Sequence, residues 1–97
     1  MSDTCLFCRI ARKEIPATVV AESEDLLAFR DIGPQAPVHV LVIPKAHIAS
    51  LNDVSDFAIV GRMAQMARDI ATQEGIGERG YRVLVDTRDY GGETVDH

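Results

Sequence analysis

Residues 31–47 read Asp31-Ile32-Gly33-Pro34-Gln35-Ala36-Pro37-Val38-His39-Val40-Leu41-Val42-Ile43-Pro44-Lys45-Ala46-His47. A turn with a glycine and two prolines runs here into an apolar, β-branched stretch, which is the pattern of a buried strand. His39 lies inside that stretch and His47 follows its end. A buried imidazole is costly unless it has a hydrogen-bond partner. The sequence therefore predicts that another part of the chain, or a ligand, satisfies His39.

The composition is that of an ordinary globular protein. The chain has 97 residues, 46% of them hydrophobic and 26% charged, so we expect a single domain over residues 1–97. The formal net charge of −5 argues against binding to nucleic acid or to an anionic membrane, because both call for a basic face. The sequence shows neither a run of transmembrane length nor the regions of a signal peptide. We therefore expect a cytoplasmic protein.

Turn residues and apolar periodicity predict two helices and five strands. A short helix is expected over residues 4–13, with Thr4 or Asp3 as its cap, and a long one from the cap residues 52–56 to Glu74. The long helix is expected to turn one apolar face to the core: Phe57, Val60, Met63, Ala64, Ala67, Ile70 and Ala71. The strands are expected at residues 18–22, 26–30, 38–43 and 80–86, with a fifth starting at Thr94 and cut short at His97. Hairpins in this order predict an α+β fold with an antiparallel sheet.

Cys5 and Cys8 form a Cys-x-x-Cys pair with three open interpretations. Two thiolates at this spacing hold one side of a tetrahedral zinc when two histidines complete it. A redox pair needs a β-α-β setting, which the order of elements lacks. Two inert, buried cysteines are the third interpretation. From the spacing alone, inert cysteines rank ahead of zinc, and zinc ranks ahead of redox chemistry.

Other candidate residues also have a purely structural explanation. The stretch Gly91-Gly92-Glu93-Thr94 can offer backbone amides, that of Gly92 among them, and the Thr94 hydroxyl to a phosphate, although a glycine pair between strands is more often only a turn. Asp31 can accept hydrogen bonds from both hydroxyls of a ribose, although an aspartate there more often starts a turn. Taken singly, His39 fits a satisfied core histidine and His47 a surface histidine.

Four stretches, residues 7–17, 27–48, 80–85 and 91–97, together resemble the histidine triad family, in its Hint-like branch of purine nucleoside phosphoramidases. The resemblance covers nearly the whole chain. It implies a five-stranded antiparallel sheet with one short N-terminal helix and one long central helix, paired with a second copy in a homodimer. It also implies hydrolysis of a P–N or related bond in derivatives of a purine nucleoside 5′-monophosphate, such as AMP or GMP, through a nucleotidyl-histidine intermediate.

The same resemblance implies roles for particular residues. The base would lie in an apolar pocket lined by Leu6, Phe7, Ile10, Phe29 and Ile32. Asp31 would hold the ribose hydroxyls, and His39 would sit beside the phosphate in a supporting catalytic role. Gly92 and Thr94 would contact the phosphate, and Asp86 stands near it, where Hint-like proteins usually carry an asparagine.

The resemblance gives the cysteine pair a function. In many bacterial members that start with Cys-x-x-Cys, two cysteines and two histidines bind zinc, and the matching positions are Cys5, Cys8, His47 and His97. This raises zinc above the inert interpretation. With four protein ligands and no open position, the Zn²⁺ would be structural.

One departure concerns the catalytic motif. The family nucleophile is the middle histidine of His-x-His-x-His, and the sequence ends at the first of the three, His97. We therefore expect the nucleophile to lie beyond residue 97 and the 97-residue chain to be inactive. Two alternatives stay open: a nonenzymatic nucleotide-binding or sensing module, and a dinucleoside polyphosphate hydrolase.

Overall fold

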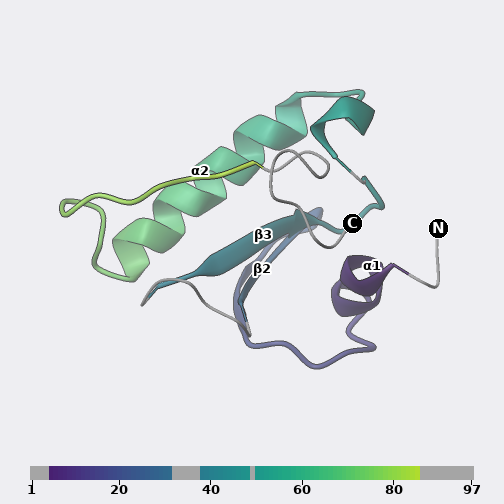
Figure 1. Ribbon diagram of the computed structural model, residues 1–97, viewed down its shortest axis with the longest axis horizontal. Helices are drawn as coiled ribbons and strands as arrows, with labels where there is room; N and C mark the ends of the chain where they lie inside the picture. Colours follow the sequence, from purple (N-terminus) through teal and green to yellow (C-terminus); the bar gives the residue numbers. More distant parts are fainter. Residues whose placement is uncertain (1–4, 32–37, 49, 86–97) are drawn as a thin grey trace.

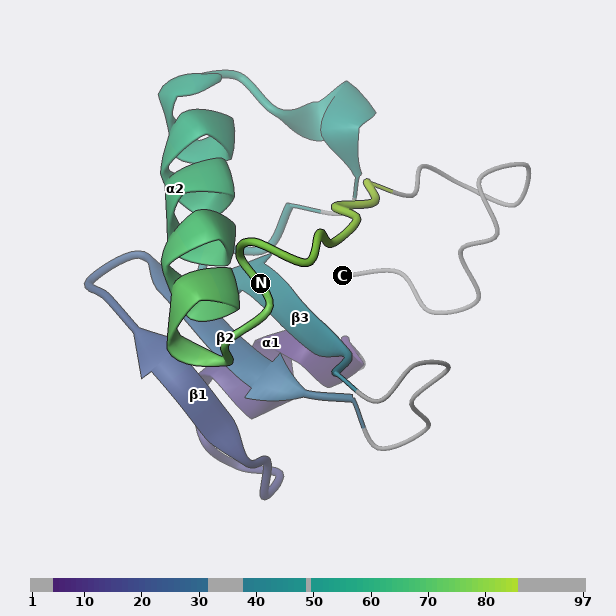
Figure 2. The same cartoon turned by 90° about the vertical axis from the view of Figure 1, so that its left-hand side faces the viewer.

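A sheet lies between two helices in the computed structural model, which describes residues 5–31, 38–48 and 50–85 (Figure 1). In chain order the elements are α1 (Leu6–Ala11), β1 (Val19–Glu22), β2 (Leu26–Arg30), β3 (Val40–Pro44), a 3₁₀ turn η1 (Leu51–Asp53) and α2 (Ala58–Gln73). Helix α1 covers one face of the sheet and α2 covers the other, as Figures 1 and 2 show from two directions. The predicted α+β class is confirmed.

The sheet is antiparallel and has the order β1-β2-β3. The turn of the first hairpin is closed by Ser23, whose backbone N–H donates to Leu26 O at 2.9 Å and whose Oγ accepts from Leu26 N at 3.2 Å. In the second pair of strands, Leu26 lies opposite Pro44 and Arg30 lies opposite Val40. The first three predicted strands are therefore present, in the predicted antiparallel arrangement.

Strand β3 is less buried than its apolar sequence predicts. Val40, Leu41 and Val42 are half-buried, and only Ile43 and Pro44 are fully buried. Within the described part of the chain, β3 is an edge strand, since β2 is its one neighbour in the sheet. An edge strand lacks a neighbour on one side, and this explains the exposure.

The predicted fourth strand differs from the structure. Residues 81–85 carry no strand pairing among the described residues, and Tyr81, Val83, Leu84 and Val85 are 46%, 57%, 69% and 63% exposed. A strand exists only where its backbone pairs with another, and local β propensity does not supply that partner. The predicted fifth strand, residues 94–97, lies outside the described residues.

The largest part of the core lies between the sheet and α1. Leu27, Phe29 and Ile43 pack with Ile10 of α1, and half-buried Phe7 and Leu41 pack against this cluster. Successive residues of a strand point to opposite faces, so Leu26 and Ala28 face α2 instead. These two are buried as well, at 2% and 0% exposure. Strand β2 is therefore buried on both faces, as the central strand of a sheet that lies between two helices must be.

Helix α1 is shorter than predicted and is capped by a different residue. Cys5 is the N-cap, and its Sγ accepts a hydrogen bond from Cys8 N at 3.4 Å. Thr4 and Asp3, the expected caps, lie outside the described residues. The helix ends at Ala11, because Lys13 adopts a left-handed conformation with φ of 63°.

Helix α2 packs firmly only in its second half. Ile70 and Ala71 are buried, whereas Phe57 and Ala64 are exposed, so the prediction that the whole apolar face meets the core is wrong at these two positions. The helix starts at Ala58, whose N–H donates to Asp56 Oδ1 at 3.0 Å. The spacing identified an apolar stripe correctly, but spacing does not reveal how far the sheet extends beneath it.

Gly75 ends α2 in a Schellman motif. Its N–H donates to Thr72 O at 3.1 Å, the next residue's N–H donates to Ala71 O at 3.0 Å, and its φ is +77°. Neither Gly75 nor Gly61, inside α2, has an atom within 4 Å of an added Cβ. Substitutions of these two glycines by alanine therefore isolate the effect of the backbone.

We expect Gly75→Ala to lower the free energy of unfolding by about 1 kcal/mol, because alanine is strained at positive φ. We expect Gly61→Ala to raise it by about 0.5–1 kcal/mol, because alanine favours a helix interior. Urea denaturation of the two variants measures both changes. If both substitutions raised the free energy of unfolding, or both lowered it, the assignment of Gly75 to the end of α2 would be contradicted.

Candidate functional site

Three of the five predicted base-binding residues, Phe7, Ile10 and Phe29, meet on the α1 face of the sheet. The rings of Phe7 and Phe29 lie 6.3 Å apart between centroids, at an interplanar angle of 42°. Phe29 and Ile10 are 4% and 8% exposed, so they form the interior of the cluster, whereas Phe7 is half-buried and reachable. Leu6 is 39% exposed on α1 and is not part of the packed cluster. Ile32 lies outside the described residues.

Leu41 belongs to this face and was missed from the sequence. It packs against the cluster of Ile10, Leu27, Phe29 and Ile43, and it lies opposite Phe29 in the sheet. The signal was available: Leu41 is two residues after His39 in a strand, so both point to the same face. Half-buried Leu41 therefore joins Phe7 as a reachable apolar side chain near His39.

Asp31 and His39 lie side by side, next to this apolar cluster. Asp31 N donates to His39 O at 3.0 Å, and Oδ2 of Asp31 lies 3.2 Å from Nδ1 of His39. The side chains are 24% and 33% exposed, so the pair is accessible to a small molecule. The prediction that His39 needs a polar partner is met by Asp31. Asp86, Gly92 and Thr94, the predicted phosphate-side residues, lie outside the described residues.

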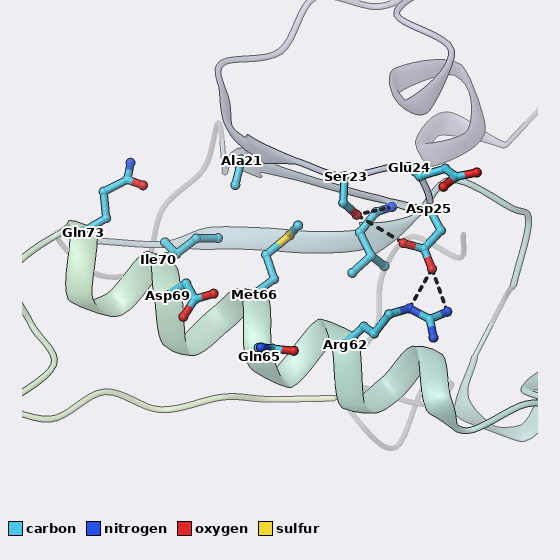
Figure 3. Close-up of a pocket in the computed structure, with 11 residues that line it drawn as sticks. Ala21, Ser23, Glu24, Asp25, Arg62, Gln65, Met66, Asp69, Ile70 and Gln73 are labelled. Atoms are coloured by element: carbon cyan, nitrogen blue, oxygen red, sulfur yellow. Dashed lines mark hydrogen bonds and ion pairs between the residues drawn. The ribbon is translucent and has the colours of Figure 1, made fainter.

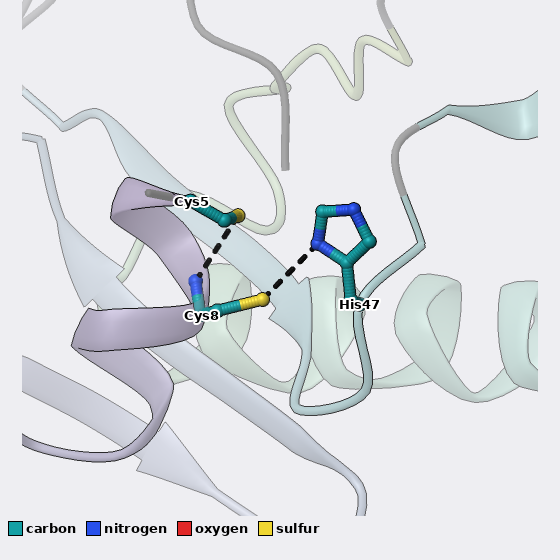
Figure 4. Close-up of side chains that lie close together, drawn as sticks. All are labelled: Cys5, Cys8 and His47. Atoms are coloured by element: carbon teal, nitrogen blue, oxygen red, sulfur yellow. Dashed lines mark hydrogen bonds between the residues drawn. The ribbon is translucent and has the colours of Figure 1, made fainter. Parts of the chain in front are cut away.

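Three predicted metal ligands converge at the start of α1. The ligand atoms of Cys5, Cys8 and His47 all lie within 4.8 Å of one another (Figure 4). Cys8 Sγ is 3.1 Å from His47 Nδ1. Both cysteines are buried and His47 is exposed. Burial raises the pKa of the Cys8 thiol, and so does its hydrogen bond with Cys5. His97, the predicted fourth ligand, lies outside the described residues.

The chemistry and spacing of these donors fit a tetrahedral metal ion. Around a zinc with Zn–S bonds of about 2.3 Å, two ligand atoms lie about 3.7 Å apart, so small movements of these side chains suffice. Two thiolates and an imidazole are ligands that zinc prefers. A bound ion would oppose the raised pKa of Cys8, since the thiolate is the coordinating form. The cluster can therefore hold a metal ion.

A separate groove lies on the α2 face of the sheet, between α2 and the β1–β2 hairpin (Figure 3). Its volume is about 350 Å³. At one end Arg62 binds the Asp25 carboxylate through Nε at 2.8 Å and Nη2 at 2.6 Å, and this hydrogen bonding lowers the pKa of Asp25. None of the predicted site residues lines the groove. The candidate site on the α1 face and this groove are therefore distinct.

Neither described helix is long and apolar enough to cross a membrane.

Comparisons with known proteins identify the family. A model of the HIT domain matches residues 12–97. A purine nucleoside phosphoramidase of Escherichia coli (strain K12) is 46% identical over 99 aligned positions, covering 100% of this chain and 83% of the relative. Protein HitA of Neisseria gonorrhoeae is 40% identical over 97 positions, covering 98% of this chain and 90% of the relative.

Solved structures agree in fold and in sequence. A HIT family hydrolase from Legionella pneumophila Philadelphia 1 has a TM-score of 0.92 and 50% identity, covering 97% of this chain and 86% of that one. A histidine triad protein from Clostridium difficile has a TM-score of 0.96 and 40% identity, covering 100% and 86%. A domain match over most of the chain, relatives at 40–50% identity and a shared fold lead to one conclusion: the chain belongs to the histidine triad, or HIT, family.

Proposed function

We propose that the protein hydrolyses P–N or related bonds in derivatives of purine nucleoside 5′-monophosphates, such as those of AMP or GMP. The observation that carries this proposal is the pair of Asp31 and His39, held 3.2 Å apart at the margin of the apolar cluster beside α1. A nucleotide needs this combination: an apolar surface for the base, a carboxylate for the ribose and an imidazole near the phosphate. The E. coli relative, named a purine nucleoside phosphoramidase, supports the same reaction.

Each site residue has a separate role in the proposed reaction. The base stacks on the reachable side of Phe7 and contacts Leu41, above the buried floor of Phe29 and Ile10. Asp31 accepts hydrogen bonds from the ribose hydroxyls. The family's nucleophilic histidine attacks phosphorus in line and displaces the amine, and water then cleaves the nucleotidyl-histidine bond. His39 supports the phosphoryl group during these steps.

We also propose that the metal ion is zinc, with His97 as the fourth ligand. The ion would join α1 to the segment after β3, because Cys5 and Cys8 belong to the first and His47 to the second. Helix α1 carries Phe7 and Ile10, so this connection would hold the base pocket in shape without entering the chemistry. We also place the protein in the cytoplasm, where reducing conditions keep cysteines in the thiol form that a metal site needs.

We infer a homodimer from an exposed apolar segment. Tyr81, Val83, Leu84 and Val85 are 46–69% exposed, and large apolar side chains exposed within one short segment favour association. We expect Leu84→Glu to shift sedimentation from the dimer to the monomer, because a charge in an apolar interface is costly. Glu24→Gln, an exposed change in the β1–β2 turn, is the control. A protein that sediments as a monomer before any substitution would refute the inference.

The reaction is tested by the choice of substrate. Adenosine 5′-phosphoramidate should be turned over faster than a diadenosine polyphosphate by the protein as its gene encodes it. Preference for the diadenosine compound would favour the dinucleoside polyphosphate hydrolase instead. Tight binding of AMP without turnover of either compound would favour a nonenzymatic binding module.

A further inference from the structure

Asp31 and His39 extend the β2–β3 ladder by one position. The last paired residues are Arg30 and Val40, and the hydrogen bond from Asp31 N to His39 O, at 3.0 Å, places the next two residues opposite each other. Side chains of directly opposite residues in an antiparallel pair lie on the same face. The sheet itself therefore sets the separation of this carboxylate from this imidazole.

The contact between the two side chains selects one tautomer of His39. Nδ1 lies 3.2 Å from Asp31 Oδ2. An ionised carboxylate only accepts hydrogen bonds, so the shared hydrogen belongs to Nδ1. In the neutral ring Nε2 then carries the lone pair, and the direction of Nε2 is fixed by the Asp31 contact.

The same carboxylate can serve the ribose as well. A carboxylate has two oxygens and about four acceptor positions, and the contact with His39 is made by one oxygen, Oδ2. Alternation along the strands places Asp31 on the face of Phe29 and His39 on the face of Leu41, which is the face of the apolar cluster. Asp31 therefore stands between the region for the nucleoside and the imidazole.

We propose that Asp31 is a positioning residue for His39, in addition to its role at the ribose. It holds His39 in the Nδ1–H tautomer with Nε2 directed at the phosphoryl group, so that binding of the nucleoside and orientation of the imidazole depend on one carboxylate. The catalytic consequence rests on the proposed function. The tautomer itself does not, and it can be measured separately.

The first experiment measures the tautomer in the nucleotide-free protein. Long-range ¹H–¹⁵N correlation spectra of protein labelled in histidine should show His39 as the Nδ1–H form. Asp31→Ala should convert it to the Nε2–H form that free imidazole side chains prefer, and Asp31→Asn should give a mixture, since an amide can donate or accept. Glu24→Gln, which removes one negative charge at the other end of β2, should leave the spectrum unchanged. An unchanged His39 tautomer in Asp31→Ala would overturn the proposal.

The second experiment separates positioning from ribose binding. The probes are adenosine 5′-phosphoramidate and its 2′,3′-dideoxy analogue, which offers Asp31 no ribose hydroxyl. With the analogue, Asp31→Ala should leave KM near the wild-type value but lower kcat by about tenfold, because His39 is no longer oriented. If Asp31 served only the ribose, the variant and the wild type would turn over the analogue at equal rates, and that result would overturn the proposal.

The two experiments distinguish a failure of the proposed function from a failure of the proposed role of Asp31. A wild-type protein that turns over neither probe refutes the proposed function, and the tautomer measurement then decides the role of Asp31 alone. If Asp31→Ala does not fold, as judged from the dispersion of its amide spectrum, Asp31→Asn takes its place in both experiments. It keeps the size and shape of the side chain, and its expected kcat with the analogue lies between those of the wild type and the alanine variant.

Discussion

The variant His47→Gln is expected to lose its bound zinc and to melt at least about 10 °C below the wild type. An ion present at about 100 times its dissociation constant stabilises the folded state by about 2.7 kcal/mol. For a domain of this size, each kcal/mol shifts the melting temperature by about 4–8 °C. His47 is exposed, so its replacement removes a ligand without opening a cavity in the core. Elemental analysis and calorimetry of the purified variant measure both effects.

His39→Gln is the matched control for this prediction. It also replaces a histidine by a glutamine, but His39 is half-buried and is not part of the cluster of Cys5, Cys8 and His47. It should therefore keep one zinc per chain. Equal zinc contents in the two variants, or well under one zinc per chain in the untreated wild type, would show that Cys5, Cys8 and His47 do not form a zinc site.

Leu27→Ala is expected to lower the free energy of unfolding by about 3 kcal/mol. Leu27 is 1% exposed and packs against Ile10, Phe29 and Ile43 in the central strand. Truncation of a fully buried leucine costs about 2–5 kcal/mol, because apolar contacts are lost and a cavity remains. Urea denaturation measures the difference in the free energy of unfolding between the variant and the wild type, with the dependence of this free energy on urea concentration held equal for the two proteins.

Leu51→Ala is the comparison for Leu27→Ala. Leu51 lies in the exposed 3₁₀ turn η1 and is 39% exposed, so its truncation should cost less than about 1 kcal/mol. Similar costs for the two leucines would contradict the assignment of the core to the space between the sheet and α1.

Local patterns predicted the elements with strong, short-range signals. The first hairpin needed only two apolar runs and the turn at Ser23, and β2 was predicted with the bounds that the structure shows. The end of α2 followed from Gly75, which takes the positive φ that glycine tolerates best. The metal cluster depended on a family resemblance, because no spacing in the sequence connects Cys8 with His47, 39 residues away.

Features set by distant partners could not be predicted. Whether residues 81–85 pair as a strand depends on a neighbouring backbone and not on their own β propensity. Phe57 continues the apolar stripe of α2 but lies where none of the described strands covers it, at 59% exposure. The family resemblance implied that Asp31 contacts the ribose and that His39 contacts the phosphate. It did not imply that the two residues contact each other, which follows from the register of β2 and β3.

Titration of ¹⁵N-labelled protein with AMP tests the location of the nucleotide site most directly. Amide signals of Phe7, Asp31, His39 and Leu41, on the α1 face, should shift in a saturable manner. Signals of Met66 and Gln73, in the groove on the α2 face, should stay in place. Shifts confined to the groove, or no saturable shifts on the α1 face, would contradict a nucleotide site built around Asp31 and His39.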